Sequence, residues 1–163
     1  MSTLHVTSCI HAPVERIFDL SRSTSLHKAV LRKYKKGALE TGADSLLKQD
    51  DKVGFKLQFL GRTRELVTRI ENLEFPKQFV STLVRGPFKT LTHEQHFKPI
   101  DNGTLLIDVL EYEPAFGSMG KLADRAMIRS FLKKYLDAKN RLIQQYAEGE
   151  KWKVILPEKT KNK

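Results

Sequence analysis

Cysteine is almost absent from this sequence, and that scarcity excludes two kinds of small scaffold. With Cys9 as its only cysteine, the chain forms no internal disulfide and offers no thiolate cluster for structural zinc. No stretch reaches the roughly 18 apolar residues of a membrane span. The first residues also lack the basic and then apolar segments of a secretory signal. We therefore expect a cytoplasmic protein with no transmembrane segment. Peripheral contact with a membrane surface stays open.

Glycine-rich motifs that bind phosphate are also missing. Gly61, Gly86, Gly103, Gly117 and Gly120 fit neither the Gly-x-Gly-x-x-Gly nor the Walker-type pattern. The Gly-x-Ser-x-Gly elbow of serine hydrolases is absent as well. These absences predict that the protein uses no nucleotide cofactor, and nothing in the sequence indicates any other cofactor.

Positive charge is in excess, with 29 Lys and Arg against 19 Asp and Glu and a formal net charge of +10. Much of it lies between Arg22 and Lys36 and in the last fourteen residues. Such an excess favours anionic partners, but Tyr34 is the only aromatic side chain in the first segment able to stack on bases. We expect no nucleic-acid partner and interpret the charge as a solvated surface, with binding of anionic surfaces through Arg22–Lys36 as an alternative.

Hydrophobic periodicity predicts the order of the elements. Leu4, Val6, Ser8 and Ile10 alternate with more polar residues, which is typical of a half-buried strand. Pro13 then favours a helix start, and two short helices are predicted to end near residues 21–23 and 32. Alternating runs separated by turn signals follow over residues 35–113, and they predict an antiparallel meander.

A single long helix is predicted after the strands, over residues 119–148. Its apolar side chains recur at steps of three and four. They are Ile128, Phe131, Tyr135, Ala138, Leu142 and Tyr146. The only large surface on which this stripe can be buried is the sheet, so we predict an α+β helix-grip fold: a curved antiparallel sheet of six or seven strands around the long C-terminal helix, with two short helices after the first strand. The domain should cover residues 1–149, and residues 150–163 should form a basic, flexible tail.

Several motifs resemble those of the SRPBCC superfamily, also called START-like or Bet v-like. They are Ile10–Phe18 (apolar strand, Ala-Pro, then Val-x-x-Ile-Phe), Phe75–Phe79, Arg85–Phe88, His93, Phe97, residues 103–105 and residues 108–113. Over residues 3–148 they look like a bacterial subgroup of unassigned ligand-binding proteins. The resemblance implies a cavity between sheet and helix. It leaves the function open, because the superfamily contains lipid carriers, polyketide cyclases, hormone receptors and ring-hydroxylase subunits.

Strand alternation gives a candidate set of pocket residues. If Leu91 and Phe97 point inward, so do His93 and Gln95, and inward Phe79 and Leu83 imply inward Ser81 and Arg85. Such a polar stripe within apolar walls would orient a ligand. The alternative is that these residues lie at the end of the sheet, exposed or paired with one another. Tyr112, Met127, Phe131 and Tyr135 are further candidates for the pocket wall, with ordinary core packing as their alternative.

No residue is assigned a catalytic or metal-binding role. His93 and His96 would point to opposite faces of a strand, so they do not form a metal site by themselves. Asp108 would face away from Glu111 and Glu113, and some of these carboxylates are predicted to neutralise Arg62, Arg64 or Arg85 across strands.

The function predicted from these observations is binding of an apolar small molecule, such as a lipid, fatty acid, polyketide or aromatic metabolite. The alternative is an enzyme like the polyketide cyclases and dehydratases, with His93 or Arg85 positioning an enolate. We expect a monomer or a weak dimer.

Overall fold

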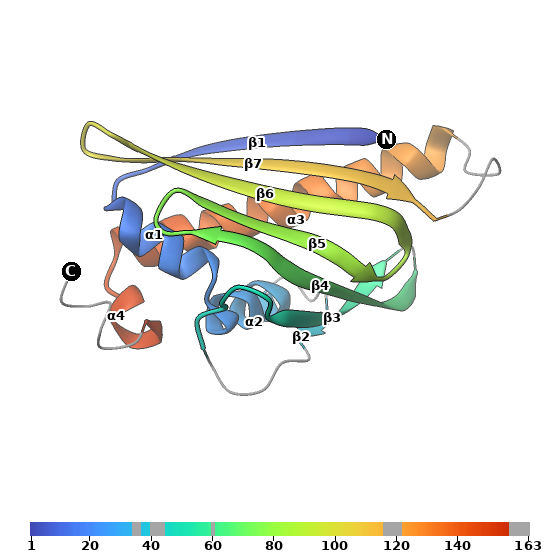
Figure 1. Cartoon of the computed structure of the whole chain (residues 1–163), viewed down its shortest axis with the longest axis horizontal. Helices are drawn as coiled ribbons and strands as arrows, with labels where there is room; N and C mark the ends of the chain where they lie inside the picture. The colour runs from blue at the N-terminus through green and yellow to red at the C-terminus, as the bar shows by residue number, and fades with distance from the viewer. Residues whose placement is uncertain (34–36, 40–44, 60, 116–121, 157–163) are drawn as a thin grey trace.

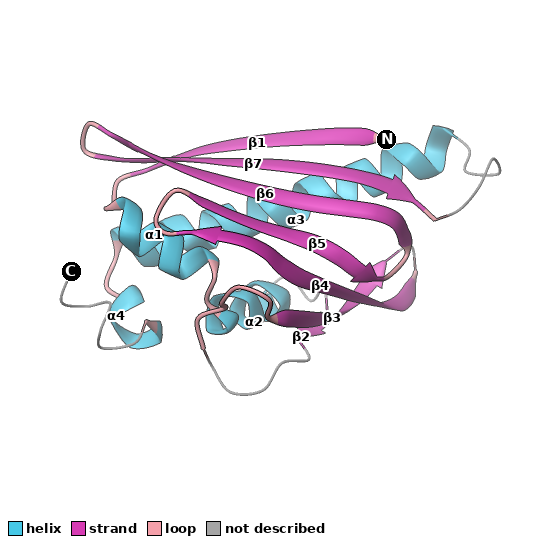
Figure 2. Cartoon of the chain, viewed as in Figure 1, coloured by secondary structure: helices cyan, strands magenta, loops and turns pink. Residues whose placement is uncertain are grey.

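A computed structural model describes residues 1–33, 37–39, 45–59, 61–115 and 122–156 of the chain. In these residues a curved sheet lies against one long helix, with the shorter helices gathered at one end (Figures 1 and 2). The strands are β1 (Ser2–Ile10), β2 (Gly37–Leu39), β3 (Lys52–Phe59), β4 (Arg62–Glu74), β5 (Gln78–Arg85), β6 (Phe88–Ile100) and β7 (Gly103–Pro114). The helices are α1 (Val14–Ser21), α2 (Thr24–Lys33), α3 (Leu122–Glu148) and α4 (Trp152–Ile155).

The sheet has seven strands in the order β1-β7-β6-β5-β4-β3-β2, and every neighbouring pair is antiparallel. The predicted meander is therefore confirmed from β2 to β7. Strand β1 pairs with β7 and forms one edge of the sheet. Figure 1 shows α3 running behind the sheet, with α1 and α2 at the end where β1 leads into the helices. The predicted helix-grip fold is confirmed.

The β6–β7 hairpin explains one of the sequence signals. Ile100 pairs with Gly103, so the loop consists of Asp101 and Asn102, and Asn102 adopts a positive φ of 62°. Gly103 is required for a different reason: a Cβ there would collide with the carbonyl oxygen of Ile10. In this Asn-Gly pair, Asn102 supplies the positive φ that the turn needs, and Gly103 allows β1 to approach closely.

Helix α3 buries the stripe that the periodicity predicts. Ile128, Ala138 and Leu142 are buried, whereas Arg129 and Lys133 on the opposite side are exposed. Residues 119–121 of the predicted helix lie outside the described part of the chain. Within the described residues, no helix combines the length and apolarity needed to cross a bilayer.

The start of the predicted tail differs from the expectation. Residues 152–155 form α4, and Leu156 is 3% exposed. Leu156 belongs to the main core, the hydrophobic cluster that also contains Ile10 and Phe18. The Trp152 ring lies under the Arg16 guanidinium, 3.9 Å from the ring centroid. An aromatic ring and a leucine supply enough apolar surface to dock this segment. Residues 157–163 lie outside the described residues, so the flexible tail stays a prediction for them.

The buried side chains form two clusters, one at each end of α3. The first, the main core, contains Ile10, Phe18 and Leu142 and lies near α1 and α2. The second contains Leu4, Leu110 and Leu132 at the other end of the sheet. Tyr135 packs against both clusters. It therefore marks the place where the two meet.

Candidate functional site

A cavity lies between the sheet and α3, lined by side chains from both clusters. It measures about 90 Å³, counted as the space open to the centres of water-sized molecules. One water needs roughly 10–15 Å³ on this measure, so the cavity has room for an organic molecule. Its walls are mainly apolar and come from β3, β4, β5, β6, β7 and α3. Among them are Phe55, Leu66, Phe79, Leu91, Leu110 and Leu132.

A few polar side chains interrupt these walls. They are His27, Thr68, Ser81, His93, Gln95 and Lys139. They come from α2, three adjacent strands and α3, so residues far apart in the sequence meet at the same surface. An apolar hollow with a small number of convergent polar groups is the usual form of a small-molecule site.

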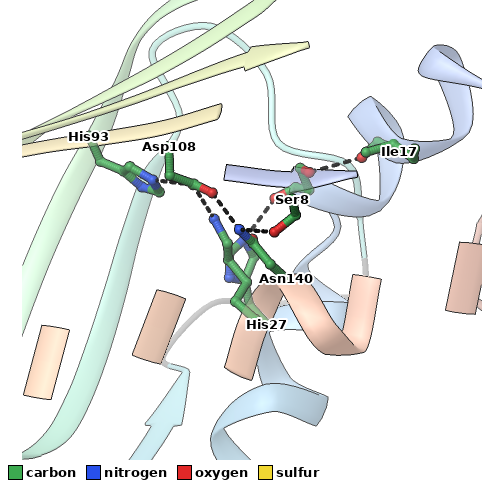
Figure 3. Close-up of polar contacts among 8 residues, drawn as sticks. Ser8, Ile17, His27, His93, Asp108 and Asn140 are labelled. Atoms are coloured by element: carbon green, nitrogen blue, oxygen red, sulfur yellow. Dashed lines mark hydrogen bonds and ion pairs between the residues drawn. The ribbon is translucent and has the colours of Figure 1, made fainter. Parts of the chain in front are cut away.

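Asp108 of β7 is the centre of a buried hydrogen-bond cluster at the cavity wall (Figure 3). Its Oδ1 accepts from Lys139 Nζ at 2.8 Å and lies 2.7 Å from His93 Nε2. Its Oδ2 accepts from Asn140 Nδ2 at 2.6 Å, and Asn140 also donates to Ser8 Oγ at 3.3 Å. Three elements, β6, β7 and α3, are thereby joined through one carboxylate.

The electrostatics of this cluster favour one charge state. Burial by itself would raise the pKa of Asp108, but the Lys139 ammonium and the hydrogen bonds from His93 and Lys139 outweigh it and lower the pKa below its usual value. Burial and the nearby Lys139 charge lower the pKa of His93, against the opposing effect of Asp108. At neutral pH the cluster therefore holds one anion, one cation and a neutral imidazole.

His27 of α2 lies on the same cavity and is also neutral. Burial, followed by the charge of Lys139, lowers its pKa to about 4. Its Nε2 lies 2.9 Å from the carbonyl oxygen of Ser21, and its ring meets Phe55 edge to face at 6.2 Å. Its Nδ1 is buried and has no hydrogen-bond partner among the described residues.

Gln95 of β6 presents a second unsatisfied polar atom. The residue is 1% exposed, and its Nε2 makes no hydrogen bond to any part of the chain that the structure describes. A buried donor without a partner is unfavourable by about 1–3 kcal/mol. His27 and Gln95 therefore each bring one buried, unsatisfied polar atom to the lining of the same cavity.

Five of the eight predicted pocket residues line this cavity. They are Ser81, His93, Gln95, Phe131 and Tyr135. The alternation argument was thus correct for β6 and for the middle of β5. Burial, with Asp108 adding to it, raises the pKa of the Tyr135 hydroxyl, so this group stays protonated. That these five residues contact a ligand stays a prediction.

Arg85 is placed elsewhere, because β5 contains a bulge. Thr68 pairs with Leu83 but Val67 pairs with Arg85, so Val84 is an extra residue and the alternation shifts. Arg85 therefore points outward and donates to Glu65 Oε1 at 2.5 Å. Period-two reasoning assumes an unbroken ladder, and the bulge breaks it.

Met127 and Tyr112 also lie away from the cavity. Met127 is 55% exposed, because it falls one position before the buried Ile128 on α3. Tyr112 is buried in the second cluster, edge to face with Phe88 at 6.0 Å. Core packing, the alternative for Tyr112, is what the structure shows.

The sequence reasoning missed Lys139 and Asn140 as the partners of Asp108. Asp108 pairs with Lys139 of α3, not with an arginine of a neighbouring strand. Two charged residues at inward positions carried the signal: Lys139 lies within the apolar stripe of α3, and Asp108 shares the inward phase of Leu106 and Leu110. When two residues of opposite charge both lie at inward, otherwise apolar positions, the pattern predicts that they pair, because a buried charge needs a partner.

The remaining ionisable candidates face solvent or one another. Glu113 pairs with Lys89 at 2.9 Å, and His96 Nε2 lies 2.9 Å from Glu94 on the outer face of β6. His93 and His96 therefore lie on opposite faces, as predicted. Among the described residues, no cluster of three or more His, Cys, Asp or Glu is arranged to hold a metal ion.

Comparison with known proteins identifies the fold. No protein-family profile and no curated protein matches the sequence. A solved structure from Thermus thermophilus matches with a TM-score of 0.73 and 17% identity, over 88% of this chain and 95% of that one. A START superfamily protein from Mycobacterium smegmatis matches with a TM-score of 0.66 and 14% identity, over 90% of this chain and 97% of that one.

A plant protein shares the same architecture. The major latex-like protein 151 of Panax ginseng matches with a TM-score of 0.64 and 14% identity, over 90% of this chain and 97% of that one. The chain therefore has the START-like, Bet v-like helix-grip fold, and the resemblance seen in the sequence is confirmed for the fold. At these identities the comparison does not extend to function.

Proposed function

We propose that this protein binds an apolar small molecule in the cavity between the sheet and α3. One observation carries the proposal: the hollow lies where the two hydrophobic clusters meet, and apolar side chains wall most of it. A protein interior is normally close-packed, and an apolar void forfeits dispersion contacts. A ligand of matching polarity would restore those contacts.

The polar cluster supports binding more than turnover. Asp108 is engaged by Lys139, His93 and Asn140 at the same time. A carboxylate that accepts three hydrogen bonds and has a lowered pKa is a weak base. Its geometry fits a role in fixing the cavity wall, with β6, β7 and α3 held in register.

The experiment is a test of occupancy with a matched pair of variants. Ser81 is small, buried and on the cavity wall, so Ser81→Phe should fill the hollow. Thr82→Phe places the same ring on the other face of β5, where Thr82 contacts Glu71. The uncharged dye Nile red should bind to the wild type and to Thr82→Phe, and Ser81→Phe should lose at least tenfold in affinity.

The proposal is wrong if Nile red binds equally to all three proteins, or to none of them. Native mass spectrometry of the freshly purified protein provides a second readout. A retained apolar molecule should be present in the wild type and in Thr82→Phe but absent from Ser81→Phe.

The enzyme alternative rests on a single contact, that of His93 with Asp108 at 2.7 Å on the cavity wall. A neutral histidine oriented by a carboxylate can act as a general base. If turnover of a cyclisable polyketide-like substrate is found, His93→Ala should abolish it, and unchanged turnover would eliminate this role.

A further inference from the structure

We propose that the ligand is an uncharged apolar molecule carrying a hydroxyl group, and that the hydroxyl is held by the His27 imidazole and the Gln95 amide. This inference rests on the proposed function and narrows it to a class of ligand. Two observations support it: the charge balance of the cavity, and the two buried polar atoms of cavity-lining residues that have no hydrogen-bond partner among the described residues, His27 Nδ1 and Gln95 Nε2.

Charge balance argues against an anionic ligand. Of the described side chains that line the cavity, Lys139 is the only permanent cation, and Asp108 already neutralises it at 2.8 Å. A ligand carboxylate or phosphate would add a second anion beside Asp108 without a second cation. Burying an unpaired charge is strongly unfavourable. A ligand cation would meet the same difficulty beside Lys139.

His27 offers an acceptor. The Ser21 carbonyl oxygen only accepts hydrogen bonds, so His27 Nε2, 2.9 Å away, must carry the ring proton. With its pKa lowered to about 4, the ring carries no second proton at neutral pH. The buried Nδ1 therefore presents a lone pair, and it lacks a partner among the described residues. A ligand must donate to satisfy it.

Gln95 offers a donor on the same cavity. Its Nε2 is buried and unpartnered within the described chain, and the residue pairs across the sheet with Phe79 and Asp108. His27 and Gln95 line the same cavity, together with Lys139 and His93. Both unsatisfied atoms therefore belong to side chains that a single ligand in this cavity meets.

A hydroxyl group satisfies both requirements with one oxygen. It donates through its O–H and accepts through its lone pairs. A ketone, ester or ether accepts only, and a hydrocarbon does neither. Because the rest of the wall is apolar, the remainder of the ligand should be hydrocarbon or aromatic.

The test compares three naphthalene probes of similar shape at neutral pH. We expect 2-naphthol to bind the wild-type protein about tenfold more tightly than naphthalene, and at least tenfold more tightly than the anion 2-naphthoate. The same ranking is expected for 1-decanol over decanoate, which covers a chain-shaped ligand. Binding is measured by calorimetry or by the fluorescence of the naphthalene ring.

Leucine variants test whether Gln95 and His27 bind the hydroxyl group of the probe. Gln95→Leu and His27→Leu should each bring the affinity for 2-naphthol close to that for naphthalene. Thr92→Leu, on the outer face of the same strand as Gln95, should leave the preference unchanged. Two independent variants keep the test valid if one of them fails to fold, which circular dichroism will reveal.

The outcomes separate this inference from the proposed function. If naphthalene or 2-naphthoate binds as tightly as 2-naphthol, or if both leucine variants keep the preference, the hydroxyl inference is overturned while the binding function stands. If none of the probes binds, and Nile red does not bind either, both are overturned.

Discussion

Lys139 Nζ lies 2.8 Å from Asp108 Oδ1, and the two side chains are 1% and 0% exposed. The contact joins the middle of α3 to β7, and Asn140, the next residue of α3, donates to the other oxygen of the same carboxylate. Buried ion pairs often add little net stability, because both charges lose their hydration. Their effect on specificity can be larger: this pair permits one register of α3 on the sheet, the one that places Lys139 over Asp108.

Removing one partner of this pair should be more harmful than removing both. Asp108→Asn leaves Lys139 buried without a counter-charge, and we expect it to lower the free energy of unfolding by about 3–5 kcal/mol. The double variant Asp108→Asn/Lys139→Met should recover much of that loss. Urea unfolding measures both values.

A matched control lies on the same strand. Glu111 is exposed on the outer face of β7, so Glu111→Gln should change the free energy of unfolding by less than about 0.5 kcal/mol. If Asp108→Asn and Glu111→Gln were equally mild, the buried pair would have no structural role.

Acid should destabilise the protein through its buried histidines. His27 has a pKa of about 4 when folded and an ordinary value of 6.5 when unfolded, so between these values the unfolded chain binds more protons. The free energy of unfolding should therefore fall as the pH is lowered through this window, by about 3 kcal/mol for His27 alone. The lowered pKa of His93 acts in the same direction.

His27→Gln isolates this contribution, since it removes the titrating ring. Urea unfolding at a series of pH values from about 7 to 4.5 should give a shallower decline for the variant. Above about pH 4.5 the carboxylate of Asp108 is largely ionised in both the folded and the unfolded state, so it adds little to the slope. An identical decline in the two proteins would contradict the neutral, buried state of His27.

Arg85 and Met127 should be dispensable for ligand binding, although the sequence pattern placed them in the pocket. Arg85 forms an exposed pair with Glu65, with the two side chains 66% and 43% exposed, and such pairs contribute about 0–1 kcal/mol. Arg85→Ala and Met127→Ala should leave the affinity for Nile red within about twofold of wild type. A larger loss in either would place that side chain at the ligand.

The segment after α3 should contribute to stability. Leu156 is 3% exposed in the main core, and Leu156→Ala should lower the free energy of unfolding by about 2–4 kcal/mol. Val154, two residues earlier, is 84% exposed, so Val154→Ala serves as the control and should have almost no effect. Equal effects of the two changes would mean that this segment does not dock on the domain in solution.

The sequence by itself determined the order of the elements from β1 to α3, although it missed α4. Alternation identified β1 and the strands of the meander, and a stripe at steps of three and four identified α3, because each pattern is set by the local geometry of the backbone. The antiparallel order followed, because the short turns between successive strands cannot hold the long crossover connections that parallel strands need. The inward phase of His93 and Gln95 was also local, because β6 is regular at those residues.

Only the tertiary structure decided which side chains meet across elements. The bulge at Val84 turned Arg85 outward, and no local pattern announces a bulge. Lys139 and Asp108 are 31 residues apart, and His27 belongs to a helix that supplied none of the predicted pocket residues. Their convergence depends on how far the sheet curves around α3. That curvature is fixed by the fit of the whole core, and the same fit leaves the hollow on which the proposed function depends.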